Sequence, residues 1–243
     1  MFATCVRCGL ALVLVPVFMN ASTAGWVLQH AGTSARLYDV TVNHSSDRIA
    51  WACGDSGVII HTTDGGALWT RQVTGTRATL HAIAFQEAPG TPVIAVGDSG
   101  IILRTTDNGL TWNRIDAGTH LALNEVSDFG LVAVGDSGTI LKSTDRGLNW
   151  THVPSGTTER LNACAGFAPA ICGDHGTLLR PSTPPGTWAP VDIGRTEHLH
   201  GVPMFSSPGP VVGEGGLIAR STDVNTRLSS TEVVLRAACM CAS

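Results

Sequence analysis

The sequence has few charged side chains: Asp, Glu, Lys and Arg make up 14% of its 243 residues, against roughly 25% in an average soluble domain. Aromatic residues reach only 5%, with a single tyrosine, and the formal net charge is −4. Without an excess of Lys and Arg, the chain lacks the electrostatic footprint of a nucleic-acid-binding protein. Glycine, by contrast, occurs 28 times, and apolar residues make up 43%. This composition excludes a disordered chain and favours short strands joined by tight turns.

The N-terminal apolar run is too short to span a bilayer, which takes about 20 residues. It extends from Gly9 to Met19 behind Arg7, and Ser22 and Ala24 follow at the small-residue positions that a signal peptidase reads. We therefore predict a signal peptide over residues 1–24, with an uncleaved anchor as the alternative. The mature protein is then exported (secreted, periplasmic, or in the thylakoid lumen if the source is photosynthetic). It is not an integral membrane protein, although its partner can be one.

Cysteines are too few and too scattered for a disulfide framework. The cleaved chain keeps an odd number of them: Cys53, Cys164, Cys172, Cys239 and Cys241. Cys164 and Cys172 flank one short turn, so they can pair across neighbouring strands or serve as small buried apolar residues. Apolar residues at the matching repeat positions favour the second interpretation. The last two cysteines lack the second half of a metal site, and we predict neither a metal nor a cofactor.

One short motif recurs through most of the sequence. Gly-Asp-Ser-Gly occupies residues 54–57, 97–100 and 135–138, and weaker copies occupy 173–176 and 213–216. The acidic residues of the five copies are spaced 43, 38, 38 and 40 residues apart; they are Asp55, Asp98, Asp136, Asp174 and Glu214. A period near 40 with several short strands in each unit is typical of β-propeller blades. Helical solenoids have a similar period, but the sequence lacks the amphipathic helical stripes that they require.

Each unit contains three strands, A, B and C, followed by a strand D that starts at a tryptophan. Gly-Asp-Ser-Gly joins B to C, and glycine supplies the positive φ that a tight turn demands. Strand D is expected at Trp26, Trp69, Trp112, Trp150 and Trp188, so the first D strand has no blade of its own. We predict that residues 26–29 pair with the last triple and close a ring, which hides both edges. The alternative is that the chain from Leu228 onward supplies that strand.

The fold class predicted from these repeats is all-β: a β-propeller of about five four-stranded blades, closed by the N-terminal strand in the last blade. The propeller is assigned to residues 25–226. Residues 227–243 have no repeat features and are expected to form a poorly ordered tail.

A second motif, Ser/Thr-x-Asp-x-Gly-x-x-Trp, lies between strands C and D and matches the Asp-box of BNR-type repeats. Its aspartate can accept hydrogen bonds from turn amides, its glycine permits a left-handed conformation, and its tryptophan buries a large ring. We interpret these positions as structural. They are Thr62, Asp64, Gly66 and Trp69; Thr105, Asp107, Gly109 and Trp112; Ser143, Asp145, Gly147 and Trp150; Trp188 in the fourth copy; and Ser221 with Asp223 in the fifth.

The two motifs together, Gly-Asp-Ser-Gly-x-Ile-Leu-x-Thr-Thr-Asp-x-Gly-x-x-Trp, resemble the Ycf48/Hcf136-like photosystem II assembly factors over about residues 26–226. The resemblance implies a β-propeller without enzymatic activity that holds a partner protein during assembly. Members of that family are typically seven-bladed, whereas five units are visible here. Similar repeats also occur in exported proteins unrelated to photosynthesis, so a generic secreted ligand-binding propeller is the alternative.

The loops between strand D and the next strand A carry a first set of candidate partner-binding residues. These are Arg36, Arg77, Arg160 and Arg195, expected on the same face as the acidic turns. The set can bind an acidic or carboxylate-bearing peptide, which is how the resembling family is thought to use arginines. Glu159 and Glu197 in the same loops favour solvated mixed charge instead. The acidic turn residues can hold a cation or a basic segment, but Asp also suits such turns by itself, and we favour that interpretation.

A second set of basic residues ends strand C at one repeat position. Its members are Arg104, Lys142, Arg180 and Arg220, with His61 in the first unit. Partner binding is one explanation. Long stems that pack between blades while their charged heads reach water or an Asp-box explain the pattern better.

An enzyme is the least favoured interpretation. Sialidases also carry Asp-boxes, but they need a tyrosine nucleophile beside a carboxylate, together with an arginine cluster. The single tyrosine, Tyr38, lies near the start of the first strand A, where core packing explains it. Ser56, Ser99 and Ser137 recur too regularly to supply a unique nucleophile. We therefore predict a non-enzymatic scaffold that binds another protein or peptide and not nucleic acid, with a sialidase-like glycoside hydrolase as the remaining alternative.

Overall fold

The computed structural model describes residues 27–43, 45–86, 92–127, 130–165, 170–184, 186–202, 210–220 and 227–230. Within these ranges the chain forms five antiparallel sheets of four strands each. The strands of every sheet are neighbours in the same order as in the sequence. The predicted all-β propeller of about five four-stranded blades is therefore confirmed.

We number the blades in chain order. Blade 1 contains β1 (Leu37–Asn43), β2 (Ser46–Gly54), β3 (Ile59–Thr62) and β4 (Thr70–Arg71). Blade 2 contains β5 (Leu80–Phe85), β6 (Val93–Gly97), β7 (Ile102–Thr105) and β8 (Asn113–Ile115). Blade 3 contains β9 (Leu123–Val126), β10 (Val132–Gly135), β11 (Ile140–Lys142) and β12 (Thr151–His152). Blade 4 contains β13 (Leu161–Ala165), β14 (Ala170–Gly173), β15 (Leu178–Ser182) and β16 (Thr187–Pro190), and blade 5 contains β17 (Leu199–Gly201), β18 (Pro210–Gly213), β19 (Leu217–Arg220) and β20 (Arg227–Ser230).

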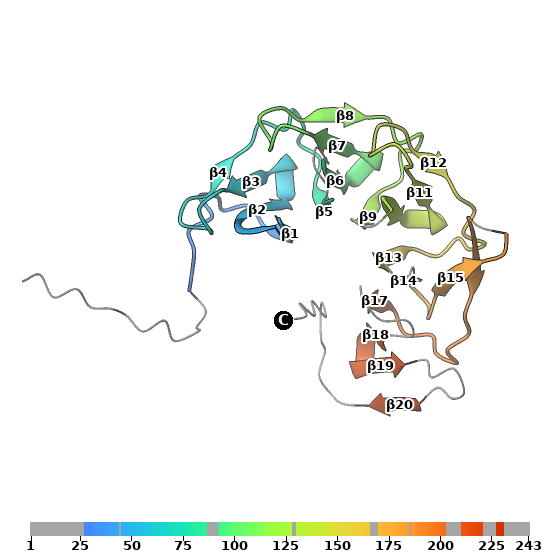
Figure 1. Cartoon of the computed structure of the whole chain (residues 1–243). Helices are drawn as coiled ribbons and strands as arrows, with labels where there is room; N and C mark the ends of the chain where they lie inside the picture. Colours follow the sequence, from blue (N-terminus) through green and yellow to red (C-terminus); the bar gives the residue numbers. More distant parts are fainter. Residues whose placement is uncertain are drawn as a thin grey trace, which may run out of the picture.

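The blades follow one another along an arc (Figure 1). The first strands of the blades, β1, β5, β9, β13 and β17, lie on the inner side of the arc and contact one another in chain order. The fourth strands β4, β8, β12 and β20 lie on its outer side. Successive sheets therefore stack face to face, so each blade has a leading face toward the preceding blade and a trailing face toward the next.

The hydrophobic core lies between the blades. Between blades 2 and 3, Ile94 and Val96 pack with Leu123 and Leu141. Similar clusters join blades 1 and 2, blades 3 and 4, and blades 4 and 5. This arrangement follows from strand geometry, because successive side chains project to opposite faces and each blade supplies one apolar set to each neighbour.

The Gly-Asp-Ser-Gly segments form tight turns between strands B and C. The predicted positive φ falls on serine as well as on glycine: Ser56 has a φ of 56° and Gly57 a φ of 69°. The first glycine of the turn, Gly54, has an extended backbone, so glycine is required there for a reason other than a positive φ. A Cβ at Gly54 would lie 1.9 Å from the carbonyl oxygen of Arg36. Glycine is required there because the strand A entry passes too close for any side chain.

Hydrogen bonds inside each Asp-box hold the connection between strands C and D. In blade 2 the Thr105 hydroxyl donates to Asp107 Oδ1 at 2.7 Å and accepts from the Gly109 amide at 3.0 Å. Asp107 also accepts from the Thr111 amide at 2.9 Å. The matching residues of blades 1 and 3 make the same contacts to their threonine or serine. The aspartate is thus surrounded by donors from its own turn.

These donors favour the ionised carboxylate. Hydrogen bonds from the Thr111 side chain, the Thr105 side chain and the Thr111 amide lower the pKa of Asp107 to about 2. The Asn149 amide and side chain lower the pKa of Asp145 to about 2. In the fourth copy, Trp188 is half-buried against the cluster between blades 3 and 4. Ser221 and Asp223 of the fifth copy lie outside the described residues.

The fourth strand of blade 5 comes from the C-terminal side of the chain. Strand β20 pairs antiparallel with β19, with Leu228 opposite Ala219. The predicted closure of blade 5 by residues 26–29 is therefore wrong, and the alternative strand around Leu228 is observed. The adjacent segment needs a much shorter loop than the distant N-terminus to reach β19, and short loops lose less entropy on closing. The last blade consequently extends to Ser230, beyond the predicted boundary at residue 226.

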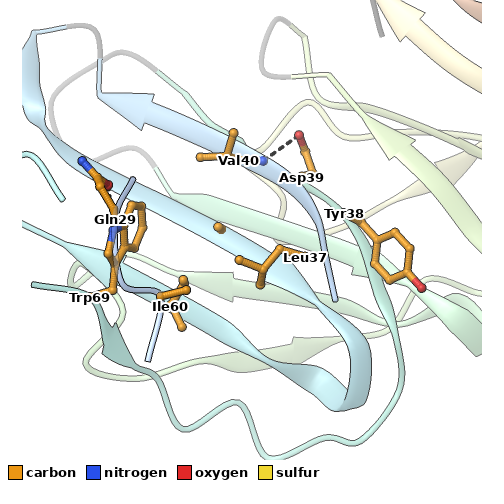
Figure 2. Close-up of a pocket in the computed structure, with 9 residues that line it drawn as sticks. Gln29, Leu37, Tyr38, Asp39, Val40, Ile60 and Trp69 are labelled. Atoms are coloured by element: carbon orange, nitrogen blue, oxygen red, sulfur yellow. Dashed lines mark hydrogen bonds between the residues drawn. The ribbon is translucent and has the colours of Figure 1, made fainter. Parts of the chain in front are cut away.

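The N-terminal segment lies against blade 1 instead. Residues 27–30 form no strand. The Gln29 side chain donates to the Gly65 carbonyl and accepts from Trp69 Nε1, both at 3.0 Å. Gln72 of blade 1 occupies the matching place beside Gly109 of blade 2. Relative to blade 1, residues 27–30 therefore lie in the same place as the end of blade 1's strand D lies relative to blade 2, with Gln29 beside Trp69 (Figure 2). The predicted signal peptide and Trp26 lie outside the described residues.

Candidate functional site

The B–C turns and the D–A loops build one continuous surface, which we call the turn face. In each blade the amide after the first turn glycine donates to the carbonyl just before strand A, as from Asp98 to Thr79 at 2.9 Å and from Asp174 to Arg160 at 2.8 Å. The second turn glycine contacts the loop that enters the next blade: the Gly138 amide donates to the Glu159 carbonyl at 2.8 Å. These bonds fix the loops both within and between blades.

The acidic residues of the turn face are each engaged by a side chain of strand A. The Tyr38 hydroxyl donates to Asp55 at 2.9 Å, and the Asn162 amide donates to Asp174 at 2.8 Å. In the remaining blades the pairs are His81 with Asp98 at 2.8 Å, Asn124 with Asp136 at 3.3 Å, and His200 with Glu214 at 3.7 Å. The acids therefore belong to a repeated polar network and not to an open ring of free carboxylates.

Sequence reasoning missed the strand A members of this network. They share one repeat position, directly after the leucine that opens each strand: Tyr38, His81, Asn124, Asn162 and His200. A polar donor at the same place in every unit was a visible signal. The asparagines also donate to the leucine carbonyl of the next blade, at 2.9 Å in both cases. This position therefore links neighbouring blades as well as turn and strand.

Mixed charge covers the turn face of blades 3 to 5. Arg160 Nε lies 3.3 Å from Asp136 Oδ1, and His198 Nδ1 lies 2.9 Å from Asp174 Oδ1. Glu159 lies 2.7 Å from His175 and raises the pKa of that imidazole through a hydrogen bond and through its charge. The two imidazoles have ring centroids 5.1 Å apart. The face thus presents cations and anions side by side, as the loop sequences indicated.

The four loop arginines are all exposed on this face. The guanidinium of Arg36 lies over the Tyr38 ring at 6.0 Å, and Arg195 Nη1 lies 3.7 Å from Glu197. Arg77 and Arg71 lie at the two ends of a loop that lines an open surface pocket of about 450 Å³. The structure therefore brings Arg36, Arg77, Arg160 and Arg195 into the loops that enter blades 1, 2, 4 and 5, on one surface. Their role in binding stays a prediction.

The second basic set, at the end of strand C, lies in varied surroundings. Arg104 Nε donates to the Arg146 carbonyl of blade 3 at 2.8 Å, which joins two blades. Lys142 and Arg220 are exposed, and Arg180 is partly buried. Arg104 makes the inter-blade contact that was expected of a packing residue. A partner-binding role for this set is untested.

His61 is the buried member of that position. It is 8% exposed and stacks on Trp51 with ring centroids 4.7 Å apart. Among the described residues its Nε2 atom has no hydrogen-bond partner. Burial lowers the pKa of His61 below its usual 6.5, because a charged imidazole would lose its hydration there.

We expect His61 to make the fold less stable in mild acid. Its pKa is lower in the folded chain than in the unfolded chain, so the unfolded chain binds more protons as the pH falls through 6.5. Stability is therefore lost as the pH falls. In His61→Phe the drop in melting temperature between about pH 7.5 and about pH 5.5 should be smaller than in the parent. His120→Gln, at an exposed position, is the control; an equal change in both variants would contradict the role of His61.

Tyr38 is not a core residue. It is 44% exposed, and its hydroxyl donates to Asp55. The expectation of core packing is wrong because the position after the opening leucine points to the turn face in every blade. A tyrosine beside a carboxylate resembles the sialidase pair, but the matching pairs in blades 2 to 5 mark it as a feature of the repeat.

We next considered metal-binding groups, cysteines and membrane-spanning helices among the described residues. They contain no group of three or more His, Cys, Asp or Glu side chains arranged to hold a metal ion. Cys53, Cys164 and Cys172 form no disulfide, and burial raises the pKa of Cys172 to about 12. Cys164 pairs in register with Ile171 and Cys172 with Ala163, so the two cysteines are not opposite each other. No helix in the described part of the chain is long and apolar enough to cross a membrane.

Comparison with known proteins gives one family and one fold. The family model described as photosynthesis system II assembly factor YCF48 matches residues 18–151. No match was found among curated proteins. A solved structure of YCF48 bound to a D1 peptide is 22% identical, with a TM-score of 0.64, over 82% of this chain and 68% of that chain.

Two further structures have the same fold. YCF48 from Cyanidioschyzon merolae is 16% identical with a TM-score of 0.64, over 82% of this chain and 72% of that one. The GH74 enzyme of Niastella koreensis is 15% identical with a TM-score of 0.57, over 76% of this chain but only 33% of the enzyme. At these identities the likeness concerns the fold alone.

Proposed function

The chain belongs to the photosynthesis system II assembly factor YCF48 family, and from this premise we propose that it is a non-enzymatic scaffold that binds a polypeptide partner. We place the binding surface on the turn face. The observation that carries the proposal is the exposure of Arg36, Arg77, Arg160 and Arg195 in loops of one surface. One solved YCF48 structure is bound to a D1 peptide, which makes a peptide the first partner to test.

The chemistry of the loops defines the partner segment. Guanidinium groups recognise carboxylates through paired, charge-assisted hydrogen bonds. The segment is therefore proposed to carry carboxylates. Asp136 already faces Arg160, and Glu197 faces Arg195, but both pairs are exposed. Exposed pairs contribute little free energy in water, so a partner carboxylate can replace them.

Export is part of the proposal. It rests on the signal-peptide pattern of residues 1–24. N-terminal sequencing of the mature protein should therefore find Gly25 as its first residue. A secreted or periplasmic compartment, or the thylakoid lumen in a photosynthetic source, would each fit. An assembly role in photosynthesis additionally requires a photosynthetic source; without one, the proposal reduces to a secreted ligand-binding propeller.

Substituting the loop arginines should weaken peptide binding. We expect Arg77→Gln and Arg160→Gln each to weaken the affinity of the purified chain for a D1 peptide by about tenfold, because each removes a charge-assisted hydrogen bond. Isothermal titration calorimetry measures the effect. Arg114→Gln, on the outer strand β8, is the matched control and should leave the affinity unchanged.

The same experiment separates the alternatives. Loss of affinity in Arg104→Gln and Arg220→Gln, but not in the loop variants, would move the site to the end of strand C. Turnover of a glycoside by the purified chain, together with no bound peptide, would overturn the scaffold in favour of a hydrolase.

A further inference from the structure

Two histidines lie side by side on the turn face where blades 4 and 5 meet. His175 belongs to the B–C turn of blade 4, and His198 ends the loop that enters blade 5. The Gly176 amide joins turn and loop by donating to the Glu197 carbonyl at 3.0 Å. The ring centroids of the two histidines are 5.1 Å apart. The side chain of His175 is 65% exposed and that of His198 is 37% exposed, so a ligand can reach both imidazoles.

Each imidazole is held through the same ring nitrogen. His175 Nδ1 lies 2.7 Å from Glu159 Oε2, and His198 Nδ1 lies 2.9 Å from Asp174 Oδ1. An ionised carboxylate can only accept a hydrogen bond, so Nδ1 carries a proton and donates in both rings. A neutral imidazole has a single N–H group, which leaves Nε2 as an acceptor. In the neutral state, therefore, neither ring can donate to a carboxylate of the partner.

Protonation reverses the role of Nε2. Both nitrogens of an imidazolium donate, so Nε2 can then make a charge-assisted hydrogen bond to a carboxylate. Within the described part of the chain, the only hydrogen bond of the His175 ring is the one from Nδ1. The hydrogen bond to Glu159 and the charge of that carboxylate raise the pKa of His175 above its usual 6.5. His175 therefore becomes charged in mild acid, where the carboxylates of a peptide are still ionised.

The charged groups around the two imidazoles come from three segments: the loop that enters blade 4, the B–C turn of blade 4, and the loop that enters blade 5. They are Glu159, Arg160, Asp174, Arg195 and Glu197. While the imidazoles are neutral, Glu159 and Asp174 repel a partner carboxylate. Once protonated, the imidazoliums balance these two acids, and the loop arginines attract the partner without that opposition.

We propose that His175 and His198 form a proton-dependent carboxylate site, in which each imidazole binds a carboxylate of the partner peptide through Nε2 only after it is protonated. This inference rests on the proposed function, because it adds a regulated contact to the same turn face. Arg36 and Arg160 hold the position of His198 in blades 1 and 4, directly before the leucine of strand A. Blade 5 thus has a titratable group where those blades have a permanent cation. Binding takes up protons, so the affinity for the peptide rises as the pH falls.

The test measures the affinity of the purified chain for a D1 peptide by isothermal titration calorimetry at two pH values. The affinity should be about tenfold higher at about pH 6.0 than at about pH 7.5, because both imidazoles gain a charge-assisted hydrogen bond. Titrations at about pH 6.5 in two buffers with different enthalpies of ionisation should show an uptake of protons on binding.

Two variants assign the effect to the histidine pair. His175→Ser restores the serine of the first three turns and fits the backbone, since the φ of His175 is 50° and that of Ser56 is 56°. It should reduce the ratio of the two affinities to about threefold. His198→Arg supplies a permanent charge, as Arg160 does in blade 4, so it should raise the affinity at the higher pH and also reduce the ratio. His30→Gln, on the N-terminal segment beside blade 1, is the control and should keep the parent ratio.

The outcomes separate this inference from the proposed function. If no peptide binds at either pH, the proposed function fails and this site fails with it. If the peptide binds with equal affinity at both pH values and without proton uptake, the proposed function stands and only the proton-dependent site is overturned. A pH dependence that His175→Ser and His198→Arg both leave unchanged would equally overturn the assignment to this pair.

Discussion

Gly100→Ala is expected to lower the free energy of unfolding by about 2–5 kcal/mol, the sum of a left-handed backbone cost and an overpacking cost. Gly100 is the second glycine of the blade 2 turn and has a φ of 66°. A Cβ there would lie 2.1 Å from the carbonyl oxygen of Thr119, which belongs to the loop entering blade 3. Since the obstacle is backbone, it cannot turn aside as a flexible side chain would.

Gly118→Ala separates the two costs. Gly118 also has a φ of 66°, but a Cβ there would meet no atom within 4 Å. This variant should therefore lose only about 1–2 kcal/mol, the cost of the left-handed conformation alone. Urea unfolding of both variants measures the difference. Equal losses would mean that the close approach of turn and loop is not a constraint, and the turn face would then be less tightly built than described above.

Leu123→Ala is expected to cost about 2–5 kcal/mol, the usual range for truncating a buried leucine. Leu123 opens strand A of blade 3 and is fully buried against blade 2. Its side chain fills the junction between two sheets, where neighbours pinned by several hydrogen-bonded strands relax little around a cavity. Thermal and urea unfolding should both report the loss.

Leu37→Ala is the matched comparison, because Leu37 holds the same repeat position in blade 1 with a 36% exposed side chain. In dilute solution it should cost clearly less than Leu123→Ala, about 1–2 kcal/mol, because less area leaves water on folding. A loss as large as that of Leu123→Ala in dilute solution would contradict an open face on blade 1.

Most of the fold could be predicted from short sequence motifs. The Asp-box positions and the Gly-Asp-Ser-Gly turns predicted the number of blades and the order of strands, because each motif closes a hairpin between neighbours in sequence. The reason for the first turn glycine was not visible in the same way. Gly54 is needed because the Arg36 carbonyl approaches it, and such an approach exists only when strand A lies beside the turn.

The candidate site was predicted in part. Loop positions placed Arg36 and Arg160 on the surface that carries the acidic turns, and the structure has them there. The partners of the acids were missed, and Tyr38 was assigned to the core. The polar residue after the opening leucine of each strand A was visible as a repeated signal, but the sequence does not show that this side chain reaches the B–C turn 17 residues further along the chain, as Tyr38 reaches Asp55.

The sequence by itself determined the blade, since a hairpin repeat needs only near neighbours to fix its strands, its turns and the alternation of its faces. Tertiary structure decided how the row of blades begins and ends. Strand β20 fills the last blade, and Gln29 anchors the N-terminal segment on blade 1. Those choices depend on competition between distant segments for one sheet edge, where loop entropy and the fit of single side chains outweigh a pattern that every repeat shares.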